Sequence, residues 1–235
     1  MPLSLNDLST SCNNVLQQVN NIPANLFLEN KQEDFLTTLI TVDLTKRLGA
    51  ASNYFITQYT GNGIKRADIA ELDSRSLVSH IECKYLYSND FMQPIRAKMN
   101  WAERELVSAL NKIGKTNNDY ILCYCIHINN INTILANIKN SYFQYGQNIF
   151  TYIHNHRITS NTLNAMFKRT NISIFNPPSG TTIEQNIQTE IGQIIHAMSS
   201  STVRSTVTSS NFRATLPSSQ IQIDFKLILY AIRVY

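Results

Sequence analysis

Asp68, Glu82 and Lys84 are the residues of this chain whose types and spacing best suit a chemical reaction. If the two carboxylates lie side by side, they repel each other unless a cation sits between them or one of them takes up a proton. Hard oxygen ligands of this kind suit Mg²⁺, with Mn²⁺ as the alternative. Such an ion can hold a phosphate oxygen, lower the pKa of a bound water and offset charge on a leaving oxygen. Lys84 could orient or deprotonate the attacking water, or stabilise the phosphate as a point charge.

Two predicted strands must position these side chains. Ile64 to Leu72 and Leu77 to Leu86 are rich in β-branched, aliphatic and aromatic residues, and the polar, turn-forming residues 73–76 separate them. This composition predicts a β-hairpin that carries Asp68 on its first strand.

The register of this hairpin decides whether the side chains meet. Pairing Asp68 with Glu82 gives a three-residue loop, Ser74 to Ser76, and places both carboxylates on one face with Cβ atoms roughly 4.5–5.5 Å apart. Because side chains alternate along a strand, Lys84 lies on that same face. A slip of one residue would place Asp68 opposite Ile81 and separate the two acids.

His80 has two interpretations. It falls on the predicted face of Glu82, where it is either a strand histidine with its own partner or a neighbour of the site. The helix predicted for Ile95 to Ile113 has a basic side, formed by Arg96, Lys98, Arg104 and Lys112, which we interpret as a solvated face rather than a binding surface.

The residues RADI at positions 66–69 and ECK at positions 82–84 resemble the D…(D/E)xK signature of the PD-(D/E)XK nuclease superfamily. This superfamily includes type II restriction endonucleases and Holliday-junction resolvases. Arg66-Ala67 stand where many members have a proline before the aspartate. The resemblance implies that Asp68 and Glu82 bind Mg²⁺ and that Lys84 positions the water. It also implies a glutamate on the first core helix, for which Glu33 is the candidate.

Glu33 has two interpretations. It lies on the apolar stripe formed by Leu36, Ile40, Leu44 and Leu48 in the helix predicted for residues 25–48. It is either a third acid that points toward the metal, or a first-turn acid favoured by the helix dipole at a frayed, hydrated helix start.

The order of predicted elements from residue 25 to 128 is helix, three strands, helix, strand. The resembled superfamily has the same α-β-β-β-α-β core, so we expect an α/β fold with a central mixed sheet flanked by helices. The expected elements before and within this core are helices at Leu3 to Val19, 25–48 and Ile95 to Ile113, and strands at Asn53 to Thr60, Ile64 to Leu72, Leu77 to Leu86 and Tyr120 to Ile128.

The chain divides, in this interpretation, into an N-terminal helical segment (1–24), a nuclease core (25–130) and an α+β extension (131–235) for dimerisation, target recognition or both. We expect helices within Ile131 to Tyr152 and at Ile183 to Met198, an exposed loop or mobile hairpin arm at Ser199 to Ser210, and a sheet-joining strand at Ile221 to Tyr235.

Composition sets wider bounds. The 235 residues carry a formal net charge of +4, which permits an anionic partner without requiring one. The four cysteines include no CxxC pair, which favours free thiols in a reducing compartment over disulfides or zinc. The N-terminus lacks the pattern of a signal peptide and no apolar run reaches membrane-spanning length, so we expect a cytoplasmic protein that does not bind membranes.

These observations predict a Mg²⁺-dependent endonuclease that hydrolyses double-stranded DNA. A type II restriction enzyme is the first hypothesis, and its two active sites would be related by the two-fold axis of a homodimer. A junction or repair nuclease on the same core is the second. A nuclease-fold protein that only binds nucleic acid or a protein partner is the third, and a chance motif on an ordinary hairpin is the fourth.

Overall fold

A computed structural model of the chain describes residues 2–24, 26–29, 32–49, 53–61, 64–91, 98–114, 116, 118–129, 179–215 and 222–235. The helices predicted between Ile131 and Tyr152 lie outside these residues. None of the described helices is long and apolar enough to cross a membrane.

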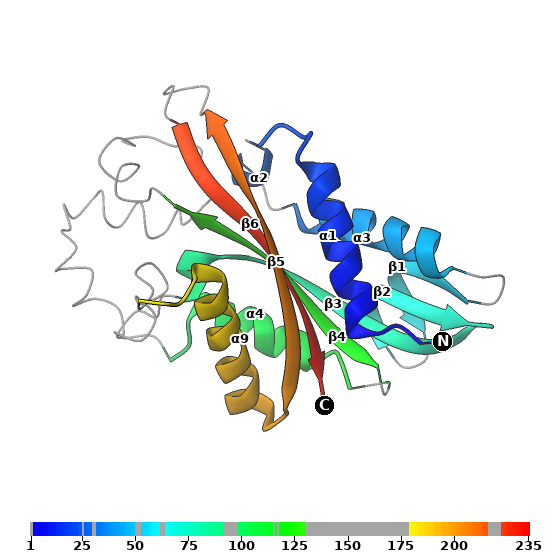
Figure 1. The fold of residues 1–235 in the computed structure, drawn as a ribbon. Helices are drawn as coiled ribbons and strands as arrows, with labels where there is room; N and C mark the ends of the chain where they lie inside the picture. The colour runs from blue at the N-terminus through cyan, green and yellow to red at the C-terminus, as the bar shows by residue number, and fades with distance from the viewer. Residues whose placement is uncertain are drawn as a thin grey trace.

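A six-stranded mixed β-sheet, in the order β1-β2-β3-β4-β6-β5, forms the centre of the protein (Figure 1). Only the β3–β4 pair is parallel, and every other neighbouring pair of this sheet is antiparallel. The predicted α/β class is therefore confirmed. The strands are β1 (Asn53–Gly61), β2 (Ile64–Asp73), β3 (Ser76–Tyr87), β4 (Asp119–Ile128), β5 (Val203–Thr215) and β6 (Gln222–Val234).

Helices cover both faces of the sheet (Figure 1). One face packs against α1 (Leu5–Val19), α2 (Leu26–Glu29) and α3 (Glu33–Leu48). The other packs against α4 (Trp101–Leu110) and α9 (Ile183–Ser199). Because both faces are covered, all ten residues of β4 are buried, as its nearly continuous apolar sequence predicts. The four cysteines are buried and free, which confirms the prediction of unpaired thiols.

The first core helix is shorter than predicted. The structure describes two helices here, α2 and α3, where one was predicted, and the side-chain amide of Gln32, the residue before α3, donates to the carbonyl of Leu26. The predicted apolar stripe is nevertheless confirmed at Leu36, Ile40 and Leu44, which are fully buried against the sheet. The shortened α3 places Glu33 in its first turn.

The second core helix also begins later than predicted. Its first residue is Trp101, where we expected Ile95. Asn100 is the reason: its side chain accepts from the Glu103 N–H while the Glu103 carboxylate accepts from the Asn100 N–H, a capping box that fixes the start. The helix ends at Leu110 and a short turn follows, in which Gly114 has φ +89°.

Residues 199–210 were predicted to form an exposed loop or a mobile hairpin arm; the loop was wrong, whereas an antiparallel strand pair is present. Val203–Thr215 is β5, which pairs with β6 along its whole length instead of forming a loop. Its threonine, serine and valine residues are compatible with a half-buried edge strand. Its Thr208 and Ser210 hydroxyls donate to the side-chain oxygens of Asn13 in α1 and of Asn20, the residue that follows α1. The predicted C-terminal strand is confirmed as β6, which lies between β4 and β5. The described C-terminal strands are thus part of the same sheet as the core.

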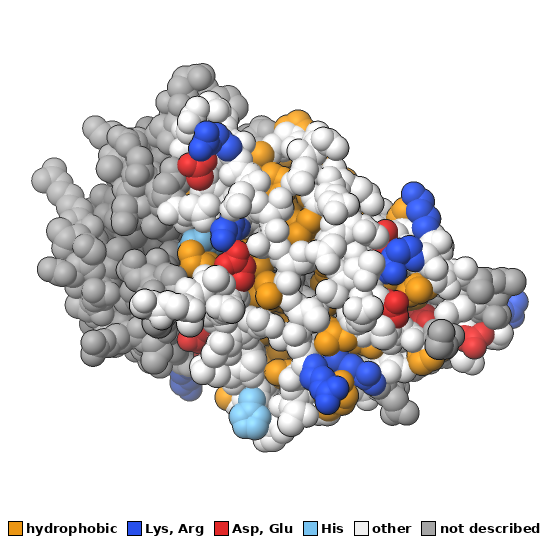
Figure 2. Space-filling model, viewed as in Figure 1, with side chains coloured by type: hydrophobic (Ala, Val, Ile, Leu, Met, Phe, Trp, Pro, Cys, Tyr) orange, Lys and Arg blue, Asp and Glu red, His pale blue; other side chains and the backbone are white. Residues whose placement is uncertain are grey.

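Charged side chains are dispersed on the side of the molecule where β5 lies between α1 and α9 (Figure 1). Figure 2 shows Lys and Arg on this side in small separate groups, several of them beside Asp or Glu. The part of this side that the structure describes therefore presents no continuous basic surface.

Candidate active site

The β2–β3 hairpin has the register that brings Asp68 and Glu82 together. Ile69 pairs with Ile81, so the next residues, Asp68 and Glu82, follow opposite each other on the same face. The predicted register is confirmed at this end of the hairpin.

The predicted three-residue loop was wrong. Asp73 pairs with Ser76, and the two residues between them have positive φ angles, +48° at Ser74 and +77° at Arg75, as in a type I′ turn. A bulge between Glu71 and Leu72 shifts the pairing of the two strands by one residue, which compensates for the shorter loop. The tight turn and the bulge together give the same pairing that a longer loop would have given.

The candidate site lies where β2 and β3 separate. β2 continues to pair with β1 as far as Ile64, but its pairing with β3 stops at Ile69. Beyond that point two carboxylates accept hydrogen bonds from main-chain N–H groups of β3 that do not pair with β2. The Cys83 N–H donates to Asp68 Oδ2 and the Tyr85 N–H donates to Glu33 Oε2, each at 2.8 Å. The two N–H groups are two residues apart on one strand, roughly 7 Å.

Asp68 and Glu82 form an interacting pair of buried carboxyl groups. Burial and the neighbouring charge of Glu82 raise the pKa of Asp68. Burial also acts to raise the pKa of Glu82, but hydrogen bonds from His80 and Lys112 outweigh it and lower that pKa. The pair therefore has unequal proton affinities, an arrangement typical of sites that hold a cation or move a proton.

Both oxygens of the fully buried Glu82 carboxylate have partners. His80 Nε2 lies 2.9 Å from Oε1, and Lys112 Nζ donates to Oε2 at 2.6 Å. His80 extends from the same strand face and is itself fully buried, whereas Lys112 comes from the turn after α4. Lys112, which lies on the face of the sheet that α4 covers, thus offsets the negative charge of Glu82.

Lys84 lies on the face of Glu82, as the alternation of β3 predicts. Its Nζ is 3.7 Å from Glu105 Oε2 on α4, and only 10% of its side chain is exposed. The ammonium is therefore held between the sheet and α4, two residues along β3 from Glu82.

The structure brings the four predicted site residues to one end of the hairpin, but not into one ligand set. Asp68 and Glu82 interact directly, whereas Glu33 is bound to the main chain of Tyr85, farther along β3. Within the described residues no group of three or more His, Cys, Asp or Glu side chains is arranged to hold a metal ion. A metal at this position would have Asp68 and Glu82 as its protein ligands, whereas the Glu33 carboxylate accepts from the Tyr85 N–H.

The donor set fits a hard divalent cation. Asp68 and Glu82 supply carboxylate oxygens, and the ammonium of Lys112 already interacts with both of them, which shows that the position attracts positive charge. Two carboxylates with water completing the shell are an ordinary protein environment for Mg²⁺.

A polar hollow of about 250 Å³ lies beside the site, between α3 and the strands β1 and β2. Arg66 lines it and is also 3.8 Å from Asp68 Oδ1, with 57% of its side chain exposed. An arginine in this position can contact a phosphate group next to the candidate site. The other lining residues are Asp34, Thr37, Thr38, Thr57 and Gln58.

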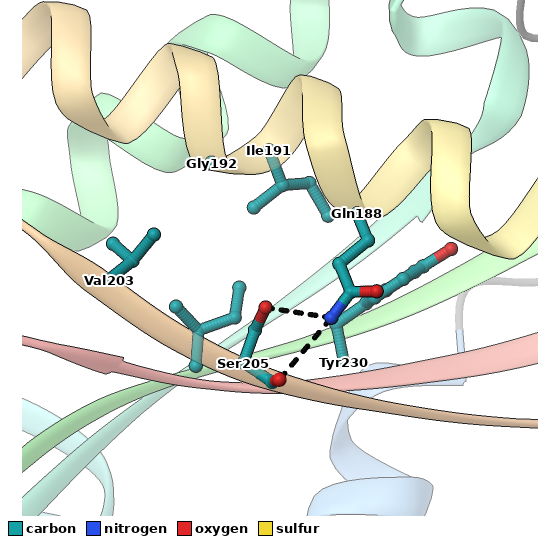
Figure 3. Close-up of a pocket in the computed structure, with 7 residues that line it drawn as sticks. Gln188, Ile191, Gly192, Val203, Ser205 and Tyr230 are labelled. Carbon is teal, nitrogen blue, oxygen red and sulfur yellow. Dashed lines mark hydrogen bonds between the residues drawn. The ribbon is translucent and has the colours of Figure 1, made fainter.

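A second hollow, between α9 and strands β5 and β6, is not a comparable site. Its lining is mostly apolar, and Gln188 spans it by donating to the backbone and side-chain oxygens of Ser205 (Figure 3). It has no room for a water molecule. We interpret it as a packing feature that holds α9 on the sheet.

Sequence reasoning missed Lys112 and left His80 undecided. Lys112 was interpreted as part of a solvated helix face, because its position depends on where α4 ends and how that turn crosses β3. His80 could be found from its spacing, since residues 80 and 82 share a strand face.

Comparison of the chain with protein-family models, curated protein sequences and solved structures finds no match to any of them.

Proposed function

We propose that the protein is a Mg²⁺-dependent endonuclease with a restriction-endonuclease-like core that hydrolyses DNA. The observation that carries this proposal is the meeting of Asp68 and Glu82 at the separation of β2 and β3, with Lys84 two residues beyond Glu82. The order α3-β1-β2-β3-α4-β4, with an antiparallel β1-β2-β3 meander and a parallel β3–β4 pair, supports the same assignment.

Each site residue has a role in this proposal. Asp68 and Glu82 bind the cation, and Glu33 is the third acid beside it. A bound Mg²⁺ would supply a Lewis acid that lowers the pKa of water and offsets charge on the phosphate. Lys84, held near Glu105, orients the attacking water or stabilises the negatively charged phosphate. Arg66 contacts a neighbouring phosphate from the polar hollow.

The test is incubation of the purified protein with plasmid and phage DNA in Mg²⁺, in Mn²⁺ and in EDTA. We expect cleavage that requires the metal and is lost in Asp68→Asn, which keeps the size of the side chain but removes its charge. Asp73→Asn is the matched control, because Asp73 is exposed and lies at the turn end of the hairpin, away from the acid pair. Absence of metal-dependent cleavage of any DNA or RNA would contradict the proposal.

Within this class we propose a type II restriction endonuclease that acts as a homodimer. The residues after β4 offer enough chain for target recognition, and a two-fold axis would place two active sites on the two strands of a palindrome. Discrete DNA fragments would support this assignment. Cleavage of branched DNA without sequence preference would favour a junction or repair nuclease on the same core.

One observation favours a second candidate function, binding of nucleic acid without cleavage. Both Glu82 oxygens already have protein partners, and no group of three metal-binding side chains is formed among the described residues. A protein of this kind would retard DNA or RNA in a gel equally well in Mg²⁺ and in EDTA, and Asp68→Asn would not alter the retardation.

A further inference from the structure

Lys112 occupies a position that a metal ion would need. Its Nζ lies 2.6 Å from Glu82 Oε2, and the same ammonium interacts with Asp68. The other Glu82 oxygen, Oε1, is held by His80. A cation bound at Glu82 Oε2 would therefore compete with Lys112 for that oxygen.

Two buried acids need a counter-charge or a bound proton even without a metal. Glu82 is fully buried and Asp68 is 4% exposed, and two buried carboxyl groups without a counter-charge are strongly unfavourable. Arg66 contributes little, because it is 3.8 Å from Asp68 and largely exposed. Lys84 is directed to Glu105 on α4. Lys112 is the cation that balances Glu82.

Lys112 is also able to leave. It follows the C-terminus of α4, in the turn before Gly114, and a third of its side chain is exposed. A rotation of this flexible side chain releases the ammonium into water without movement of the sheet. Lys84 has no comparable freedom, since it extends from the middle of β3 and is mostly buried.

We propose that Lys112 is a built-in counter-ion of the Asp68–Glu82 pair, which holds the metal position in the metal-free protein and leaves it when a divalent cation binds. This inference rests on the proposed function, because it concerns the same site. It predicts that the protein binds its metal less tightly than the two acids alone would allow, so that Lys112 sets the metal concentration at which the site fills.

The first test is calorimetric titration of Mn²⁺ into the protein without nucleic acid. Lys112→Met removes the charge and keeps most of the side-chain volume, and we expect it to lower the Mn²⁺ dissociation constant about tenfold or more, since a competing charge-assisted contact is lost. Lys46→Met, at an exposed position in the last turn of α3, should leave the constant unchanged. An unchanged or higher constant in Lys112→Met would overturn the inference.

A second measurement uses the unaltered protein and does not depend on the folding of a variant. An amine-acylating reagent should modify Lys112 slowly in EDTA and faster after addition of Mn²⁺, whereas the modification of Lys46 should not change. Mass spectrometry of the labelled peptides gives both rates. If Mn²⁺ leaves the labelling of Lys112 unaltered, the lysine does not leave and the inference is wrong.

These outcomes are distinguishable from failure of the proposed function. Tighter Mn²⁺ binding by Lys112→Met without cleavage of any nucleic acid would support the counter-ion and contradict the nuclease. Metal-dependent cleavage of DNA, with equal Mn²⁺ affinity in Lys112→Met and in the unaltered protein, would support the nuclease and contradict the counter-ion.

Discussion

Asp68 and Glu71 are acids of the same strand with different surroundings. The Glu71 carboxylate is almost fully buried on the side of α1, where it accepts hydrogen bonds from the Leu3 N–H, the Ser79 hydroxyl and the Asn53 amide. Its partners are all hydrogen-bond donors, so its charge is satisfied without a metal. Asp68 instead shares its position with a second carboxylate. The hydrogen-bond partners therefore indicate that Glu71 stabilises the fold, whereas Asp68 belongs to the candidate site.

We expect Glu71→Ala to lower the free energy of unfolding by about 2–3 kcal/mol, because it leaves buried donors without an acceptor. Urea denaturation of the metal-free protein measures the change. Asp73→Ala, an exposed acid of the same strand, should change the stability by no more than about 0.5 kcal/mol. Equal losses in the two variants would show that the Glu71 contacts do not stabilise the fold.

Lys84 is expected to act in the reaction and not in DNA binding. Lys84→Met should lower the rate of Mg²⁺-dependent DNA cleavage at least about 100-fold, since in the proposed mechanism the ammonium orients the water or stabilises the phosphate. The affinity for DNA in Ca²⁺ or EDTA should stay close to that of the unaltered protein. Glu105→Gln, which removes the partner but keeps the ammonium, should have a smaller effect on rate. A Lys84→Met protein that cleaves at the normal rate would exclude this role.

The sequence predicts some of these residues better than others for a physical reason. The shared face of Asp68, Glu82 and Lys84 follows from alternation along two adjacent strands, which is a local property. The contact of Lys112 with Glu82 depends on the end of α4 and on a crossing of segments thirty residues apart in the chain. No local pattern contains that information.

The turn between β2 and β3 has a backbone conformation that its residue types do not favour. Ser74 and Arg75 both adopt positive φ, although neither is a residue type that favours it. The bulge at Glu71 and Leu72 compensates for the short turn, which is why the register was predicted correctly from an incorrect loop.

Replacing Arg75 by glycine should therefore stabilise the protein by about 1 kcal/mol, because glycine adopts positive φ without steric cost. Thermal and urea unfolding of Arg75→Gly measure this change. Ser76→Gly places glycine at a paired strand position and should have the opposite sign. A loss of stability in Arg75→Gly would mean that the arginine side chain makes a compensating contact.

Helices and strands were predicted most reliably where an apolar pattern extends over many residues. The buried stripe of α3 and the apolar run of β4 have such patterns, and both were found. The start of α4 was set instead by one capping residue, Asn100. β5 was missed because it is rich in serine and threonine and has no regular apolar alternation, so that its pairing with β6 decides its structure.

At the scale of the whole molecule, Glu184 joins α9 to the sheet. Its carboxylate accepts from Lys226 of β6 at 2.7 Å and from Ser209 of β5. Burial acts to raise the pKa of Glu184, but the hydrogen bond and charge of Lys226 outweigh it and lower that pKa to about 2. Folding therefore favours the ionised form.

This lowered pKa predicts a loss of stability in acid. The contribution of Glu184 should be complete above its ordinary pKa of 4.5 and disappear as the pH falls through about 2. Urea unfolding across this range should show Glu184→Gln less stable than the unaltered protein at pH 7, with the difference narrowing in acid. Glu190 gives a control of opposite sign, because burial and the charge of Glu103 raise its pKa, so Glu190→Gln should be stabilising at pH 7. A constant difference for Glu184→Gln would contradict the assignment.

The place of β6 between β4 and β5 also affects how the protein is made. β4 is one of the most apolar segments of the chain, and one side of it is closed only by a strand that begins at Gln222. During synthesis the ribosome must add residues 129–221 before that closing strand exists. During much of translation the emerging chain therefore exposes the unpaired edge of an apolar strand. We expect folding to be slow, because it depends on pairing between segments far apart in the chain.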